Sequence, residues 1–241
     1  MFDESLERLR KATYDEEYRR GWENETSIVN RKDLAELLRS FDYVDNLARS
    51  LYDKEIEREY KTKKEKEMNN KKQQKINKSR MSLVYRIASD SEDNRTKIGA
   101  IVVNDRNRIL STGYNGLPGG CVLLPKRMER PEKYHWFEHA ERNAIFNAAN
   151  IGVSLNDGIM YTQGIPCSDC ARGVIQVGIK KVIVHALWEK EGKFNENQKW
   201  VDSAERSKQM FREAGVELEY YDGELETEIE GLTDGRVIKL K

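Results

Sequence analysis

The chain has 241 residues, of which 38% are hydrophobic and 35% are charged, and its formal net charge is zero. It contains no run of 18 apolar residues, and residues 1–4 lack the basic and apolar regions of a secretory signal, which disfavours a membrane span and export. The three cysteines include Cys167-x-x-Cys170 and make no disulfide framework, so the sequence predicts an intracellular, cytoplasmic protein with reduced, metal-binding thiols.

Residues 1–60 are expected to form a helical N-terminal extension of unknown role. Apolar residues recur there at helical spacing, as Leu34, Leu37, Leu38 and Phe41 and then Val44, Leu47 and Leu51. Residues 21–29 indicate a break. The sequence leaves two alternatives open: two or three amphipathic helices that pack on the catalytic domain or on another subunit, and a mobile, solvated extension.

A basic segment, residues 61–79, follows the extension and has almost no apolar residue. The net charge is −5 over residues 1–60 and +7 over residues 61–80. Such a segment cannot contribute to a core, so we expect a linker or an exposed helix. Basic residues also bind nucleic acid, but this run has no interleaved aromatic residue, which disfavours a nucleic-acid partner.

Residues 80–241 are expected to form the catalytic domain. The pattern predicts a helix over 81–88, a hairpin of strands over 98–103 and 108–113, and a helix over 136–151. It then predicts a strand over 158–163, a helix over 168–177, a strand over 181–186, a helix over 203–214 that Gly215 ends, and a strand over 216–220. The tail, 232–241, adds a short strand or a hairpin. This order indicates an α/β fold in which helices cover both faces of one mixed five-stranded sheet.

Two short motifs, His139-Ala140-Glu141 and Pro166-Cys167-x-x-Cys170, indicate a catalytic zinc site. A catalytic zinc ion takes three protein ligands and keeps one position for water, and His139, Cys167 and Cys170 supply one nitrogen and two thiolates. Both motifs lie near the starts of predicted helices, where free N–H groups favour the ionised thiols. Glu141 is two residues from the histidine, so we expect it to move protons rather than to bind zinc.

A structural zinc site is the alternative, and it would need a fourth ligand from His185, His135 or Cys121. The catalytic interpretation is favoured because each motif opens a helix and a strand separates them, which a small zinc knuckle would not require. A second zinc ion held by Cys121 and His135 stays open.

The chain resembles the deoxycytidylate deaminase family of the cytidine deaminase-like superfamily. The segments that carry this resemblance are Thr96 to Val103, Gly113 to Pro118, Phe137 to Ile145 and Pro166 to Ala171. It implies a three-layer α/β/α sandwich and hydrolysis of dCMP to dUMP and ammonia by a zinc-activated hydroxide, with Glu141 as proton shuttle, supplying dUMP for thymidylate synthesis. It also implies a homohexamer that dCTP activates and dTTP inhibits, with Gly113 and Gly116 near the effector site.

The expected substrate-binding residues lie in these segments or in the loops near them. A monophosphate needs cationic or N–H donors, for which we expect Arg95, Thr96 and Lys97, with a second basic group at Lys126, Arg127 and Arg130. Asn115 would bond the base or the sugar through its amide, Tyr114 would contact the nucleotide, and Trp188 would stack on the base.

Two other functions stay open at this point. One is the same chemistry on dCTP, deoxycytidine or single-stranded DNA. The other is an inactive binding module, which the intact Glu141 disfavours.

Overall fold

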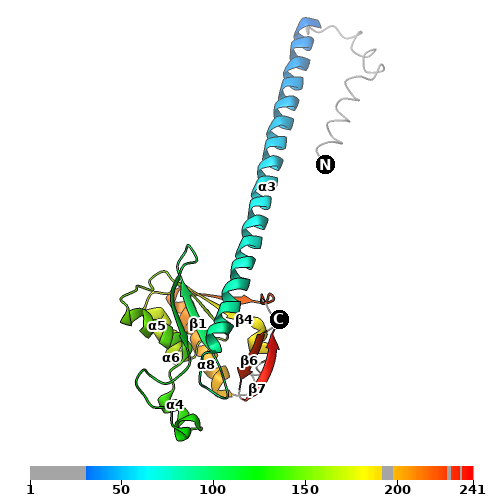
Figure 1. Cartoon of the computed structure of the whole chain (residues 1–241). Helices are drawn as coiled ribbons and strands as arrows, with labels where there is room; N and C mark the ends of the chain where they lie inside the picture. The colour runs from blue at the N-terminus through cyan, green and yellow to red at the C-terminus, as the bar shows by residue number, and fades with distance from the viewer. Residues whose placement is uncertain (1–30, 192–197, 227–228, 234, 241) are drawn as a thin grey trace. The chain divides into compact units, whose positions relative to one another are not determined.

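A computed structural model describes residues 31–191, 198–226, 229–233 and 235–240, and the chain divides into two compact units, Met1–Lys66 and Glu67–Lys241. The predicted break at 21–29 lies outside the described residues. In the described part of the extension, residues 31–60 belong to one helix, α3 (Arg31–Ala88), drawn in Figure 1.

The continuity of α3 has a local cause. Residues 31–88 contain no glycine and no proline, the two residues that most often end a helix. Charges one turn apart pair along it, as in Arg49 with Asp45 at 3.3 Å and Lys61 with Glu57 at 2.7 Å. Residues 61–79, for which the sequence left a linker or an exposed helix open, are helical throughout. No helix among the described residues is both long enough and apolar enough to cross a membrane.

The sheet has five strands in the order β2-β1-β3-β4-β5. Strand β1 (Gly99–Val103) pairs antiparallel with β2 (Ile109–Tyr114) and with β3 (Ile159–Thr162). Strands β3, β4 (Lys181–His185) and β5 (Glu217–Tyr221) are parallel. The predicted mixed five-stranded sheet is confirmed.

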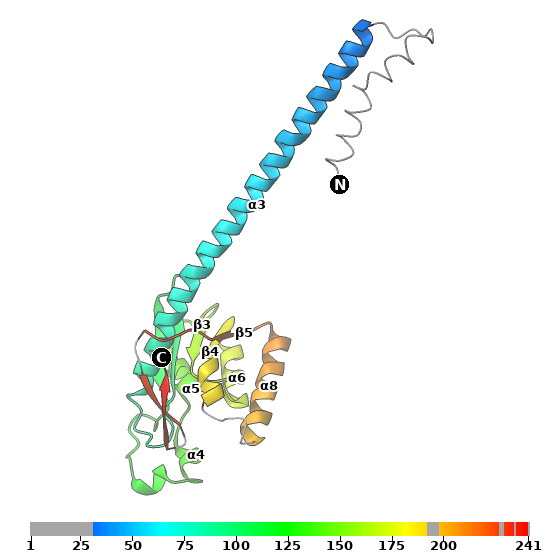
Figure 2. The ribbon, with the colours of Figure 1, turned by 90° about the vertical axis from the view of Figure 1, so that its right-hand side faces the viewer.

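Alternating residues of the strands build two cores. Ala100 and Val102 face a core formed with α5 (Ala140–Asn150), α6 (Ser168–Gln176) and α8 (Gln198–Ala214). Ile101 and Val103 face a second core formed with the C-terminal end of α3 and with α7 (Ala186–Glu191). Figure 2 shows α5, α6 and α8 together on one side of the sheet. The predicted three-layer α/β/α arrangement is therefore confirmed.

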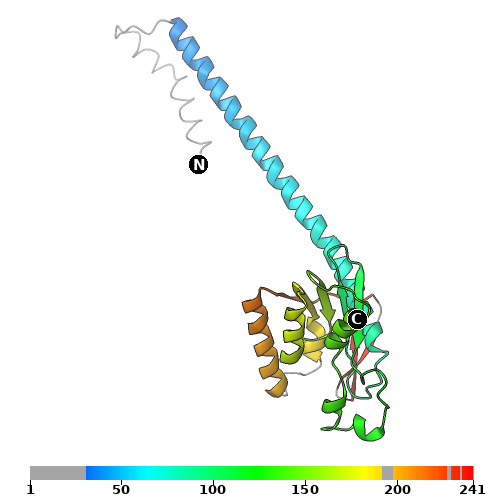
Figure 3. The same cartoon turned by 90° about the vertical axis from the view of Figure 1, so that its left-hand side faces the viewer.

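The predicted helix over 136–151 is wrong at its start. The chain instead forms a 3-10 turn, η1 (Pro125–Met128), and a short helix, α4 (Lys133–Trp136), in a segment that extends beyond the sheet (Figure 3). Phe137 is then extended, and Glu138 pairs with Gly116 through backbone hydrogen bonds of 3.1 and 2.8 Å, which a helix could not make. Helix α5 begins only after this pairing.

Two helices differ from the expectation. Trp188 lies in α7, which the sequence analysis did not predict, and helix α8 begins at Gln198, before the predicted start at residue 203. Of the two alternatives for the tail, a strand or a hairpin, the structure has the antiparallel hairpin, formed by β6 (Ile229–Thr233) and β7 (Arg236–Leu240).

Candidate metal centre and substrate cavity

Two helix N-termini bring the predicted metal ligands together. His139 is the N-cap residue of α5 and Cys167 that of α6, and both have extended backbone angles with no side chain capping the helix. Their side chains are thus left to bind elsewhere. Cys170 lies in the first turn of α6 and is fully buried. The positive ends of both helices point at the site, which favours anionic thiolates there.

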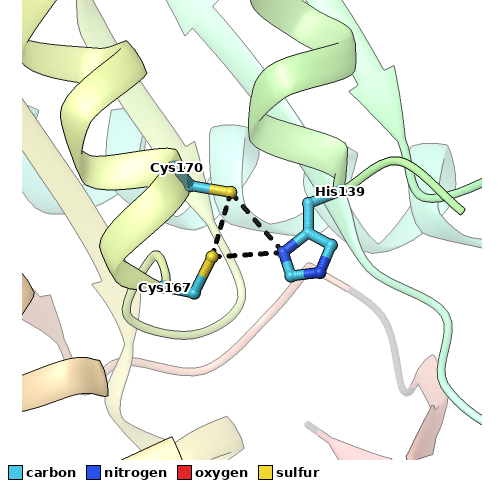
Figure 4. Close-up of side chains that lie close together, drawn as sticks. All are labelled: His139, Cys167 and Cys170. Carbon is cyan, nitrogen blue, oxygen red and sulfur yellow. Dashed lines mark hydrogen bonds between the residues drawn. The ribbon is translucent and has the colours of Figure 1, made fainter. Parts of the chain in front are cut away.

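The three ligand atoms form a compact triangle, shown in Figure 4. The Nδ1 atom of His139 lies 3.4 Å from the sulfur of Cys167 and 3.5 Å from that of Cys170, and the two sulfurs are 3.5 Å apart. Ligand atoms around a tetrahedral zinc ion, with bonds of about 2.3 Å to sulfur and about 2.1 Å to nitrogen, are about 3.5–3.8 Å apart. The triangle therefore fits a zinc ion bound by three protein ligands.

The two thiols differ in their protonation. The hydrogen bond that joins the Cys167 and Cys170 sulfurs, helped by His139, lowers the pKa of Cys167 to about 3 although burial opposes this. The same bond and burial raise the pKa of Cys170. Burial disfavours the charged form of His139, but Cys167 and Glu141 outweigh it and raise the His139 pKa above its usual value. Zinc binding must therefore displace the proton held at Cys170.

Glu141 and Arg142 surround the triangle from α5. Glu141 is 5% exposed, burial raises its pKa, and its Oε2 atom lies 3.6 Å from the sulfur of Cys170. The Nη1 atom of Arg142 lies 3.5 Å from the same sulfur. Arg142 also pairs with Glu138, which in turn accepts the N–H of His139 at 3.1 Å. The guanidinium thus places a positive charge beside a thiolate ligand and is itself held in place.

A cavity of about 210 Å³ opens beside the metal ligands. Six of the predicted site residues line it, namely Thr96, Asn115, His139, Glu141, Cys167 and Trp188. Trp188 is fully buried and also packs against Tyr85, with ring centroids 5.8 Å apart. Its expected stacking on a base and its role in packing are therefore compatible.

Three residues that were predicted to contact the substrate, Lys97, Arg95 and Tyr114, do not line this cavity. The ammonium of Lys97 donates to the carbonyls of Ser89 and Ser91, just after α3 ends, because those carbonyls lack helical partners. Arg95 is exposed, and Tyr114 is 42% exposed. Neither lines the cavity. In the second basic group only Arg130 lines it, whereas Arg127 lies over the ring of Trp136 at 3.6 Å.

The Asn115 amide is largely used by the protein itself. Its Nδ2 atom donates to Asp93 at 3.0 Å and to the carbonyl of Thr96 at 2.8 Å, and its Oδ1 atom accepts the N–H of Ile98 at 2.8 Å. An amide oxygen accepts two hydrogen bonds, so one acceptor position remains for a ligand. Asn115 therefore braces its own loop, and its predicted contact with the base or the sugar would be made through the amide oxygen.

Gly113 and Gly116, which the resemblance placed near an effector site, both contact the segment around the start of α5, and Gly113 also has a steric reason to be glycine. A Cβ at Gly113 would collide with backbone atoms of Ala140 and Ala144 in α5. Gly116 makes the bridge to Glu138 that ends next to His139. Both residues therefore join the Asn115 loop to the N-terminus of α5.

Sequence reasoning missed an ion pair at the cavity. The carboxylate of Asp93, 1% exposed, pairs with the ammonium of Lys133, 6% exposed, and both residues line the cavity. Trp200 of α8 also lines it, with its ring centroid 6.2 Å from that of His139. These residues come from segments distant in sequence. The one local indication that any of them lies near the site is the position of Lys133 and Tyr134 shortly before His139.

The alternatives for other metal ligands gain no support. Among the described residues, the group of three or more metal-binding side chains that lie together is His139, Cys167 and Cys170. Cys121 and His135 are exposed and have no third ligand beside them in that part of the chain. His185 faces the other core, where its Nδ1 atom is 2.8 Å from the hydroxyl of Tyr85.

Comparison with known proteins identifies the family. A family model described as the cytidine and deoxycytidylate deaminase zinc-binding region matches residues 74–186. The human deoxycytidylate deaminase is 35% identical over 142 residues, which cover 56% of this chain and 74% of the human protein. That of Enterobacteria phage T4 is 30% identical over 178 residues, covering 57% of this chain and 86% of the phage protein.

Among solved structures, the apo dCMP deaminase of cyanophage S-TIM5 is 26% identical with a TM-score of 0.46, covering 61% of this chain and 97% of that one. The sequence relatives decide the assignment: the length of the match, the zinc-binding region and the His-Cys-Cys triangle agree. The chain belongs to the deoxycytidylate deaminase family of zinc-dependent enzymes, within the cytidine deaminase-like superfamily.

Proposed function

We propose that this chain hydrolyses dCMP to dUMP and ammonia, and so supplies dUMP for thymidylate synthesis. The observation that carries the proposal is that Glu141, Asn115 and two of the three metal ligands, His139 and Cys167, line one cavity. Relatives named deoxycytidylate deaminase support the choice of dCMP as the substrate.

Zinc bound by three protein ligands supplies a water molecule of lowered pKa in its open position. Glu141 lines the cavity next to the metal ligands, with its Oε2 atom 3.6 Å from the Cys170 sulfur, and would move the protons of that water. In the net reaction the water oxygen bonds to C4 of cytosine and the C4–N4 bond breaks. Glu141 accepts the two protons of the water in turn and delivers one to N3 and one to the exocyclic N4, so that ammonia leaves. Burial of Glu141 keeps bulk water away from this transfer.

The phosphate of the substrate requires positively charged donors. Arg130 and Lys133 line the cavity and provide them, and Thr96 adds a hydroxyl. These two cations take the role that the sequence analysis gave to Arg95 and Lys97. Phe137, Trp188 and Trp200 supply aromatic walls for the base.

Regulation and assembly stay predictions from the family. We extend the proposal to a homohexamer in the cytoplasm that dCTP activates and dTTP inhibits. The molar mass in solution, measured by light scattering, tests the hexamer.

An ultraviolet assay tests the substrate. The panel contains dCMP, dCTP, deoxycytidine and a cytosine-containing oligonucleotide, each with and without added dCTP or dTTP effector, with zinc content measured on the same sample. Protein stripped of zinc by a chelator is the control. We expect kcat/KM to be highest for dCMP by at least about tenfold, since a lost charged contact costs roughly 1.5–3 kcal/mol. Preference for deoxycytidine or for the oligonucleotide would overturn the monophosphate assignment.

A further inference from the structure

The C-terminal hairpin of β6 and β7 lies outside the region that matches the family model, residues 74–186. Its backbone is nevertheless bonded to the loop that precedes β1. The N–H of Lys97 donates to the carbonyl of Leu232 at 2.8 Å, and the N–H of Gly235 donates to the carbonyl of Arg95 at 2.8 Å. The hairpin therefore lies against the same loop that Asn115 and Asp93 hold at the cavity.

This pairing brings Thr233 to the cavity wall. Thr233 lies between the two bonded positions, is 3% exposed and lines the cavity together with Thr96 and Ile98. Its side chain offers a methyl group for packing and a hydroxyl that both donates and accepts hydrogen bonds. A polar, nearly buried side chain at a cavity wall is suited to bind an oxygen-rich ligand.

The hairpin is fixed to the domain independently of any ligand. Ile238 of β7 packs against the second core, and the N–H of Glu226, just before the hairpin, donates to the hydroxyl of Ser82 in α3 at 2.8 Å. The hairpin lies beside the C-terminal end of α3 in Figures 2 and 3. The wall that carries Thr233 therefore exists before a ligand arrives, which lowers the entropic cost of binding.

We propose that the C-terminal hairpin is a wall of the substrate site and that the Thr233 hydroxyl binds the sugar–phosphate part of the nucleotide. This inference rests on the proposed function. The base has to direct its C4 edge towards His139 and Glu141, which leaves the sugar and the phosphate as the oxygen-bearing groups for other parts of the wall. Thr233 would then act on binding and not on the chemical step.

Three substitutions at one position test the proposal in the full-length protein. Thr233→Val removes the hydroxyl at nearly constant volume, Thr233→Ser keeps it, and Thr233→Trp fills part of the cavity. Val237→Trp is the matched control because Val237 lies on the neighbouring strand of the same hairpin and is 61% exposed. Thermal unfolding and zinc content show that each variant is folded and loaded.

The main readout is the Kd of dUMP by calorimetry, since product binding does not require turnover, with KM and kcat for dCMP beside it. A hydrogen bond of about 0.5–1.5 kcal/mol predicts that Thr233→Val raises Kd and KM roughly three- to tenfold, with kcat unchanged. Thr233→Ser should stay near wild type. Thr233→Trp should weaken dUMP binding at least about tenfold with zinc content unchanged, whereas Val237→Trp should have no effect.

Deoxyuridine, which has the sugar of dUMP but lacks its phosphate, distinguishes a contact with the phosphate from a contact with the sugar. A loss that Thr233→Val shows with dUMP but not with deoxyuridine assigns the contact to the phosphate, and an equal loss with both assigns it to the sugar. Folded Thr233→Val and Thr233→Trp proteins that bind dUMP as wild type does would overturn the hairpin proposal alone. A wild type that is inactive on dCMP but active on another cytosine substrate would overturn the proposed function, and that compound would then replace the ligand in the same comparison.

Discussion

Replacing Gly113 with alanine should destabilise the protein, because β2 and α5 touch at this glycine. An added Cβ would lie 2.9 Å from the Cα of Ala144, against 3.4 Å for the start of ordinary van der Waals contact, and closer still to the backbone N of Ala144 and the carbonyl of Ala140. These are backbone atoms of a helix and cannot rotate away. The helix has to shift, and overpacking of this kind costs about 1–3 kcal/mol.

Urea unfolding followed by circular dichroism measures the effect. We expect Gly113→Ala to lose about 2–3 kcal/mol, at the upper end of that range because all three colliding atoms belong to the backbone. Activity should also fall, since α5 begins beside His139. Gly116→Ala is the control, because its nearest neighbours are ring atoms of Tyr114 at 3.7 and 3.8 Å. Wild-type stability in Gly113→Ala would refute the packing argument, and loss of only the dCTP response would support an effector role.

Three further predictions concern single side chains. Glu141→Gln should lower kcat about 10²–10⁴-fold with zinc retained, and full activity would refute the proton-transfer role. Arg142→Gln should weaken zinc binding about tenfold in a chelator competition, because it removes the cation 3.5 Å from the Cys170 sulfur, and unchanged zinc affinity would contradict this. Burial lowers the pKa of His185 to about 4 from a usual value of 6.5, so its unfolded form binds more protons between these values. The contribution of neutral, buried His185 to the free energy of unfolding, up to about 3 kcal/mol, should be present above pH 6.5 and lost as pH falls towards 4. Urea titrations at several pH values should show that the free energy of unfolding falls less with decreasing pH in His185→Gln than in the wild type. An equal dependence on pH in both proteins would refute the assignment.

Local sequence determined the metal ligands and most of the secondary structure. The two motifs each contain ligand types that zinc prefers, and the start of the helix that carries Cys170 follows from a short-range pattern. Short apolar runs, as in Gly99–Val103, and the order of helices and strands were also sufficient to predict one buried sheet with helices on both faces. These features depend on neighbours a few residues apart, which a sequence displays directly.

Only the tertiary structure determined which residues line the cavity. Asp93, Lys133 and Thr233 meet there from three segments far apart in the chain, and no local pattern encodes such a meeting. Lys97 is the opposite case, a residue predicted to bind the phosphate that does not reach the cavity. Its ammonium instead donates hydrogen bonds to the backbone carbonyls that follow the end of α3. The interruption before α5 has the same origin: pairing with Gly116, a long-range contact, outweighed the local preference for helix.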